Sequence, residues 1–209
     1  LEPLVAEPAA DGLPAPNQAK PLELLGQILH DLGRPQEAAD AIEKASLVSP
    51  IGNSARIALA SCYAQLKRID LARELYLQLA LRRQLSPELM LHVAAGLEAI
   101  DAPHLAMQVC EWAIEMDESL PQAYYDMGTY SMRAGQPTYV AEALTRRALQ
   151  LSPTNIHYRF GLVSLMTQLK RDEEALRALG ELTPDNIAQV TCITCLTRVS
   201  DLLRRSDKI

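Results

Sequence analysis

Apolar side chains recur along most of the chain at the three- and four-residue intervals of amphipathic helices. The first such stripe ends at Gly33-Arg34-Pro35 and consists of Leu22, Leu25, Ile28, Leu29 and Leu32. A second stripe of Ala38, Ile42 and Ala45 follows and ends before Pro50. This pattern predicts two helices joined by a short turn, each with one face buried against the other.

The same pair of stripes returns with a period of 34 or 35 residues, which indicates an internal repeat. Three registers of mostly small residues keep this period: Ala38, Ala72, Ala106, Ala141 and Ala175; Gly26, Ala60, Ala94, Gly128 and Val163; and Ala45, Leu79, Ala113, Ala148 and Leu182. Two helices approach closely only where their side chains are small, so these registers mark helix crossings. One residue inserted at Gly135-Gln136-Pro137-Thr138 accounts for the longer period.

Turns and prolines punctuate the repeat at matching places. Turns equivalent to the first are expected at Lys67-Arg68, Asp101-Ala102-Pro103, Gly135-Gln136-Pro137 and Lys170-Arg171. Prolines between units stand at 87, 121, 153 and 184. Ser86-Pro87 and Thr183-Pro184 are suitable helix starts, because a capping oxygen precedes a proline placed where no amide donor is needed.

With these registers and prolines, the chain resembles the tetratricopeptide repeat family over about residues 19–188. The resemblance implies an all-α fold, a right-handed superhelical solenoid of helix-turn-helix repeats with a C-terminal capping helix. Five repeats are expected, after a Pro/Ala-rich linker at 1–19 and before a capping helix and tail at 184–209. Their approximate ranges are 20–52, 53–86, 87–120, 121–155 and 156–183. A non-repetitive helical bundle is the alternative architecture.

The four cysteines include one C-x-x-C spacing, Cys192-Ile193-Thr194-Cys195. This spacing occurs in redox and zinc sites, but here it falls inside a single helix expected at about 184–205. Both cysteines share one helical stripe with Ala188, Val199 and Leu202, so we expect them to pack in the core. A metal or redox centre is the alternative.

Composition and charge narrow the classes of function. The chain has 209 residues, 4% aromatic residues and a formal net charge of −6, and neither half is basic, so nucleic acid is not expected as a partner. No apolar run is long enough for membrane insertion. Because the first residue is Leu1, we expect a processed form or a fragment of a longer protein. The compartment is not assigned by the sequence, although the cytoplasm is favoured.

Proteins similar to this family bind extended peptides or partner helices on the concave face, which the first helix of each pair lines. Transferring that register predicts a groove with an apolar column and polar neighbours, and the cluster of aromatics between 124 and 160 favours the fourth and fifth units as the binding surface. The candidate binding residues are Ile57, Leu91, Tyr125, Thr129, Met132, Arg133, Phe160 and Ser164. The alternative is that these side chains only pack between neighbouring helices.

Catalysis has little support in the sequence. None of the four histidines, His30, His92, His104 and His157, lies in a local metal or nucleophile motif, although His30 falls in the groove register. We therefore expect no metal, no cofactor and no enzymatic activity. The predicted function is a scaffold that binds another protein or peptide, with self-association as a further outcome. The alternative is the helical-repeat portion of a larger enzyme, such as a transferase, whose catalytic domain is absent from this chain.

Overall fold

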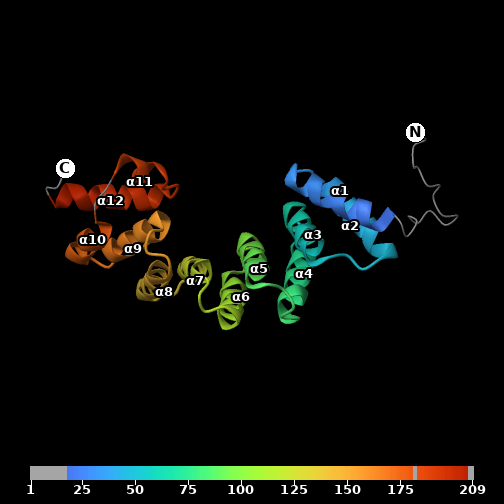
Figure 1. Cartoon of the computed structure of the whole chain (residues 1–209), viewed down its shortest axis with the longest axis horizontal. Helices are drawn as coiled ribbons and strands as arrows, with labels where there is room; N and C mark the ends of the chain where they lie inside the picture. Colours follow the sequence, from blue (N-terminus) through green and yellow to red (C-terminus); the bar gives the residue numbers. More distant parts are fainter. Residues whose placement is uncertain (1–17, 181–182, 207–209) are drawn as a thin grey trace. The chain divides into compact units, whose positions relative to one another are not determined.

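The computed structural model describes residues 18–180 and 183–206, and this part of the chain folds into helices joined by short turns (Figure 1). The described residues contain no strand, so the all-α fold expected from the sequence is confirmed. Most of the predicted linker and one register position, Leu182, lie outside the described residues. The described residues divide into two compact units, unit 1 up to residue 102 and unit 2 from residue 103 onward.

Unit 1 holds two complete helix pairs and one further helix. Within each pair the helices pack on one another, and the first helices α1, α3 and α5 also contact one another in succession. Figure 1 shows the α3–α4 pair side by side. The helices are α1 (Ala19–Asp31), α2 (Pro35–Val48), α3 (Asn53–Gln65), α4 (Ile69–Leu81) and α5 (Pro87–Ala99).

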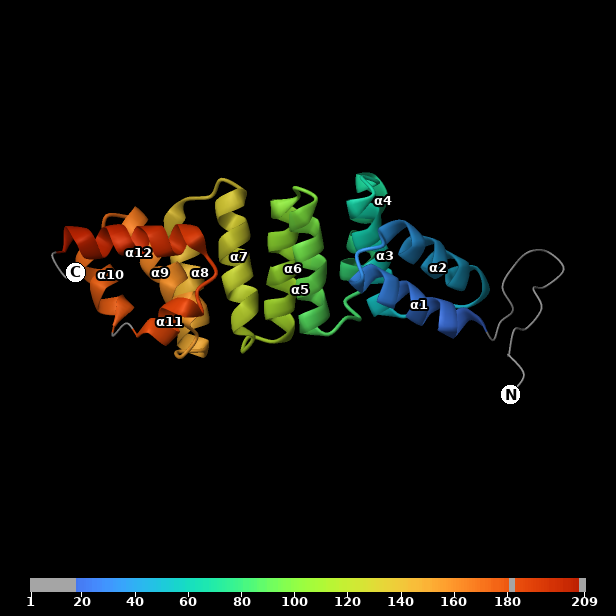
Figure 2. The ribbon, with the colours of Figure 1, turned by 90° about the horizontal axis from the view of Figure 1, so that it is seen from above.

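Unit 2 continues the pattern and ends with two additional helices. Each helix from α6 to α10 packs on the next, and the last helix packs across α9 and α10, as Figure 2 shows. The helices are α6 (Pro103–Met116), α7 (Pro121–Arg133), α8 (Thr138–Leu151), α9 (Ile156–Gln168), α10 (Asp172–Leu179), α11 (Pro184–Ala188) and α12 (Ile193–Arg205).

The five predicted turns share one backbone conformation. After α3, the Lys67 amide donates to the Ala64 carbonyl at 3.1 Å and the Arg68 amide donates to the Tyr63 carbonyl at 2.8 Å. This pair of bonds is the Schellman motif, which needs a left-handed residue after the helix. The residues in that position are Gly33, Lys67, Asp101, Gly135 and Lys170, all with φ between 59° and 75°. The left-handed turn residue therefore recurs along the chain with the same period as the small residues.

The small-residue registers lie at the helix crossings, as predicted. The five alanines from Ala38 to Ala175 are at most 1% exposed. A Cβ added at Gly26 would overlap the Ile42 side chain, and one at Gly128 would stand 3.2 Å from the Ala141 carbonyl. Val163, which replaces the small residue of the fifth unit, is fully buried in an apolar cluster. The predicted helix starts are also present, since the Ser86 and Thr183 side chains cap α5 and α11.

The expectation of one helix over 184–205 is wrong. Helix α11 ends at Ala188, and α12 begins at Ile193, with Cys192 as its N-cap residue. Cys192 and Cys195 form a disulfide, so the pair is more than a core-packing element. Helix α12 nevertheless does the capping expected of the C-terminus: Cys195, Val199 and Leu202 join the apolar cluster around Phe160.

The apolar stripe of α1 is only partly buried. Leu29 is 8% exposed, whereas Leu25, Ile28 and Leu32 are 47%, 48% and 66% exposed. Leu24 adds to this exposed surface, with 56% of its side chain accessible. Periodicity identified the stripe correctly, but α2 and α3, the helices of unit 1 that pack most closely on α1, leave this face exposed.

Candidate functional site

The first helices of unit 1 enclose a groove of about 750 Å³. Its walls come from α1, α3 and α5, and Tyr76 of α4 contributes to the lining. Small side chains keep it open: Ala58, Ala64, Ala95, Gly96 and Ala99 all line it. The Tyr76 ring packs directly against the backbone of Gly96, so closely that a Cβ at this position would overlap the ring. The groove therefore exists because small residues recur where neighbouring first helices face each other.

A polar cluster lies in this groove. His30 Nε2 is 3.0 Å from Ser61 Oγ, and His30 Nδ1 is 3.2 Å from the carboxylate of Asp31. Gln65 Nε2 donates to Ser61 Oγ at 3.4 Å. Burial raises the pKa of Tyr76 to about 12, while its hydrogen bond with Ser61 acts in the opposite direction. The cluster thus joins α1, α3 and α4 around one serine hydroxyl.

The order Asp31, His30, Ser61 is the order of groups that activates a serine nucleophile. Ser61 lies inside α3, however, where helical hydrogen bonding occupies the backbone amides around it. Acyl transfer also needs donors aimed at the developing oxyanion, and exposed backbone amides usually supply them. The geometry instead suits hydrogen bonding to a bound polypeptide.

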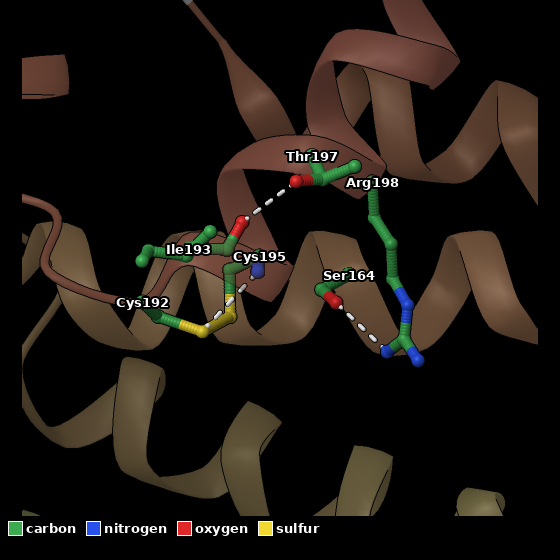
Figure 3. Close-up of a disulfide and its surroundings, with 6 residues drawn as sticks. All are labelled: Ser164, Cys192, Ile193, Cys195, Thr197 and Arg198. Carbon is green, nitrogen blue, oxygen red and sulfur yellow. Dashed lines mark hydrogen bonds between the residues drawn. A yellow bond between two sulfur atoms is a disulfide. The ribbon is translucent and has the colours of Figure 1, made fainter.

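Unit 2 has a pocket of its own, of about 500 Å³. It is bounded by α7, α8 and α9 and is closed on one side by the start of α12. Arg198 of α12 donates to Ser164 Oγ of α9 at 3.1 Å, a contact visible in Figure 3. Arg133 and Arg198 are the charged residues in the lining, so the pocket has a cationic rim.

Next to Tyr125 of this pocket lie a second tyrosine ring and a partly buried carboxylate, that of Asp126. The Tyr125 and Tyr158 rings lie 4.8 Å apart, and a Cβ on Gly161 would come within 3.0 Å of the Tyr125 ring. Tyr158 donates to Gln122, which in turn donates to Asp126 at 2.6 Å. Burial raises the pKa of Asp126 to about 6, although the hydrogen bond from Gln122 lowers it.

The predicted binding residues divide between groove and core. Ile57 lines the groove of unit 1, whereas Leu91 is buried and does not line it; Leu89 and His92 of the same helix line it instead. The residues that line the pocket of unit 2 are Tyr125, Thr129, Met132, Arg133 and Ser164. Phe160 is 1% exposed and packs in the cluster that α12 covers. Their roles in binding stay a prediction.

Sequence reasoning missed the contribution of α12 to the pocket of unit 2. Cys192, Thr194, Cys195 and Arg198 all line it, and the sequence placed these residues in a core helix. The C-x-x-C spacing was the available signal, and the uninterrupted apolar stripe concealed the helix break. The pairing of His30 with Ser61 joins residues 31 positions apart, which local motifs do not detect.

The described residues contain neither a metal-binding cluster nor a membrane-spanning helix. No group of three or more His, Cys, Asp or Glu side chains in residues 18–180 and 183–206 is arranged to hold a metal ion. None of the described helices combines the length and the apolar character required to cross a bilayer.

Comparison with known proteins agrees with this geometry. The sequence model of the tetratricopeptide repeat family matches residues 22–88. The fold is similar to that of pilF from Pseudomonas aeruginosa, with a TM-score of 0.71 and 17% identity, covering 92% of this chain and 86% of that one. It is also similar to MamA from Desulfovibrio magneticus RS-1, with a TM-score of 0.64 and 18% identity, covering 91% of this chain and 98% of that one.

At these identities the likeness to the solved structures is one of fold. A search of curated proteins found no match. The match to the family model is confined to residues 22–88, and the repeated hairpins of both units are consistent with it. Residues 22–88 match the tetratricopeptide repeat family, and the chain has the helical-repeat fold of such proteins, which is typical of scaffolds for protein–protein interaction.

Proposed function

We propose that this protein is a non-catalytic scaffold that binds a peptide or a partner helix in the groove of unit 1. The observation that carries the proposal is the groove of about 750 Å³ lined by successive first helices. Its floor is made of small and apolar side chains, and its polar groups converge on Ser61. Grooves of this kind accept side chains of a bound segment while side-chain donors and acceptors fix its backbone.

The charge of the groove narrows the class of ligand. Asp31 and Lys67 are the formally charged residues in its lining, with His30 and His92 as titratable neighbours. Such a lining offers no strong attraction to a highly acidic or a highly basic segment. The proposed ligand is therefore a largely uncharged segment with small or medium apolar side chains, anchored by its amides at His30, Ser61 and Gln65.

The pocket of unit 2 is proposed as a second contact surface. Tyr125, Thr129 and Met132 combine aromatic, hydroxyl and flexible apolar groups, which are common in binding surfaces. Arg133 adds a cation for an acidic side chain of a ligand, and Ser164 lies beside Arg198. Leu91 and Phe160 are buried and are not part of the proposed contact surface.

Peptide display on the immobilised full-length chain, followed by calorimetry with the selected peptides, tests the main proposal. Ala95 is exposed in the groove of unit 1, so Ala95→Trp places an indole in the binding path. Leu47→Trp is the matched control, because Leu47 is 66% exposed on α2 and does not line the groove. We expect the groove variant to lose at least about tenfold in affinity and the control to bind as the wild type does.

Two results would contradict the proposal. Peptides that bind equally well to both variants would place the contact outside the groove. Loss of binding in the Leu47→Trp control, with circular dichroism unchanged, would place it on the surface of α2.

Self-association is a second candidate function, favoured by the exposed apolar face of α1. Leu24, Leu25, Ile28 and Leu32 expose about half or more of their side chains on one helix. Contiguous apolar patches of this kind mark association sites in soluble proteins. Light scattering over a range of concentrations should detect a dimer that the Leu24→Glu, Leu32→Glu double variant abolishes. A constant monomer mass for the wild-type chain would refute this candidate.

A further inference from the structure

The C-x-x-C segment stands at the start of α12, where helix geometry acts directly on one of its two sulfurs. Cys192 is the N-cap residue of α12, and the Cys195 amide donates to Cys192 Sγ at 3.2 Å. The two cysteines form a disulfide with Cα atoms 5.3 Å apart, drawn in Figure 3. At a helix N-terminus, free amides and the helix dipole favour a negative charge, so a thiolate at Cys192 is stabilised.

The disulfide is accessible from the pocket of unit 2. Both cysteines line this pocket, and Cys192 is half-buried whereas Cys195 is 9% exposed. Cys192 is therefore the more accessible residue of the pair. The charged residues that line the same pocket are Arg133 from α7 and Arg198 from α12, and both favour a thiolate there.

The other two cysteines provide an internal contrast. Cys62 and Cys110 are fully buried as free thiols. Burial raises the pKa of the Cys62 thiol to about 11 and also raises that of the Cys110 thiol. Thiols of this kind react slowly because the thiolate is the nucleophile. Among the described cysteines, the reactive ones are thus expected to be Cys192 and Cys195 at the start of α12.

We propose that Cys192 and Cys195 form a redox-active pair that exchanges with the cysteine thiols of a polypeptide bound in the pocket of unit 2. A thiolate of the bound segment attacks Cys192 Sγ, forming a mixed disulfide, and Cys195 departs as a thiolate that takes up a proton. A second thiolate of the segment then attacks the segment's own sulfur and releases Cys192 as a thiolate. The segment loses two electrons and two protons, and the pair gains them.

The position of Cys192 explains why the exchange can run in this direction. A thiolate stabilised by the amides of α12 is a good leaving group, so the helix N-terminus favours the reduced pair. The peptide class follows from the lining, where Tyr125, Met132 and Leu165 provide apolar contacts to the residues around a reactive cysteine. The proposal rests on the proposed function only in that the thiol arrives on a polypeptide.

The first test needs no substitution. The full-length chain is equilibrated with reduced and oxidised glutathione in varied ratio, and free thiols are then counted by alkylation and intact mass. We expect two thiols to appear together within the range of the buffer, while Cys62 and Cys110 stay unmodified in the folded protein. A pair that stays oxidised at every ratio until the chain unfolds would overturn the proposal.

The second test separates the two sulfurs. In Cys195→Ser the remaining Cys192 should form a mixed disulfide with an aromatic disulfide reagent roughly tenfold faster than Cys195 does in Cys192→Ser. Each variant lacks the pair and retains one thiol of it, so each serves as control for the other. Equal rates would contradict the role of the helix N-terminus.

The third test identifies the source of the thiol. A disulfide-linked peptide with apolar residues beside its cysteine should react with the Cys195→Ser variant faster than oxidised glutathione does. Equal rates with the two would overturn the assignment to polypeptides. Because the glutathione arms depend on sulfur chemistry alone, they distinguish failure of the redox pair from failure of peptide binding.

Discussion

Replacing Lys67 by glycine is expected to stabilise the protein, because Lys67 holds a backbone conformation that glycine adopts without steric penalty. Lys67 has φ of 63° and occupies the left-handed position of the Schellman turn after α3. Its counterpart in the first repeat is Gly33, with φ of 70°. The repeat geometry thus requires the same conformation of a lysine and of a glycine.

The magnitude follows from two opposing effects. In the left-handed region, a residue with a Cβ lowers the stability of the folded state by about 1–2 kcal/mol. Glycine in turn lowers the stability of the folded state by about 0.5–1 kcal/mol, because it gives the unfolded chain more conformational entropy. Lys67→Gly should therefore raise the free energy of unfolding by about 1 kcal/mol. Gly33→Ala should lower it by a similar amount through φ alone, because nothing lies within 4 Å of the added Cβ.

The assay is urea unfolding followed by far-ultraviolet circular dichroism, with the slope of each transition compared before midpoints are interpreted. Lys44→Gly is the control, since Lys44 is an exposed residue in the interior of α2. This substitution should lower the free energy of unfolding by about 1 kcal/mol. Destabilisation of Lys67→Gly to the same extent as the control would refute the shared turn geometry.

Three further changes have defined outcomes. Gly96→Ala should lower stability by about 1–3 kcal/mol in thermal unfolding, because its Cβ overlaps the buried ring of Tyr76; an unchanged transition would contradict the close contact. Asp126→Asn should stabilise the protein at about pH 8 by up to about 3 kcal/mol and have little effect near pH 3. The sign follows because the raised pKa of Asp126 makes stability fall as pH rises through about 6, and a gain independent of pH would contradict it. Leu202→Ala should lower stability by about 2–5 kcal/mol in urea, since Leu202 is the fully buried residue by which the capping helix α12 packs on the apolar cluster; a loss under about 1 kcal/mol would mean that α12 is not docked.

The repeat geometry was accessible to sequence reasoning because it depends on local rules. Small residues at a fixed period mark helix crossings, and Ala106 and Ala141 are buried there. The turns were recognised for the same reason, even where Lys67 or Asp101 replaces glycine. A period seen in several registers at once outweighs an unfavourable residue at one position.

The site depended on contacts that periodicity does not encode. The stripe through Cys192, Cys195 and Val199 continues across a helix break that no glycine or proline marks, so the cysteines were placed in one helix. Phe160 shares the register of Ile57, but α12 contributes to the cluster that buries it. Register predicts which side a residue faces, whereas the identity of the covering segment is a tertiary property.

The most direct test of the scaffold account is site-specific photo-crosslinking of a display-selected peptide to the full-length chain. A photoreactive phenylalanine analogue is placed at Ala95 in the groove of unit 1, or at Leu47 on α2 for comparison. The account predicts that the peptide is captured from Ala95 and not from Leu47. Capture from Leu47 alone would contradict the claim that the groove between the first helices is where this protein holds its partner.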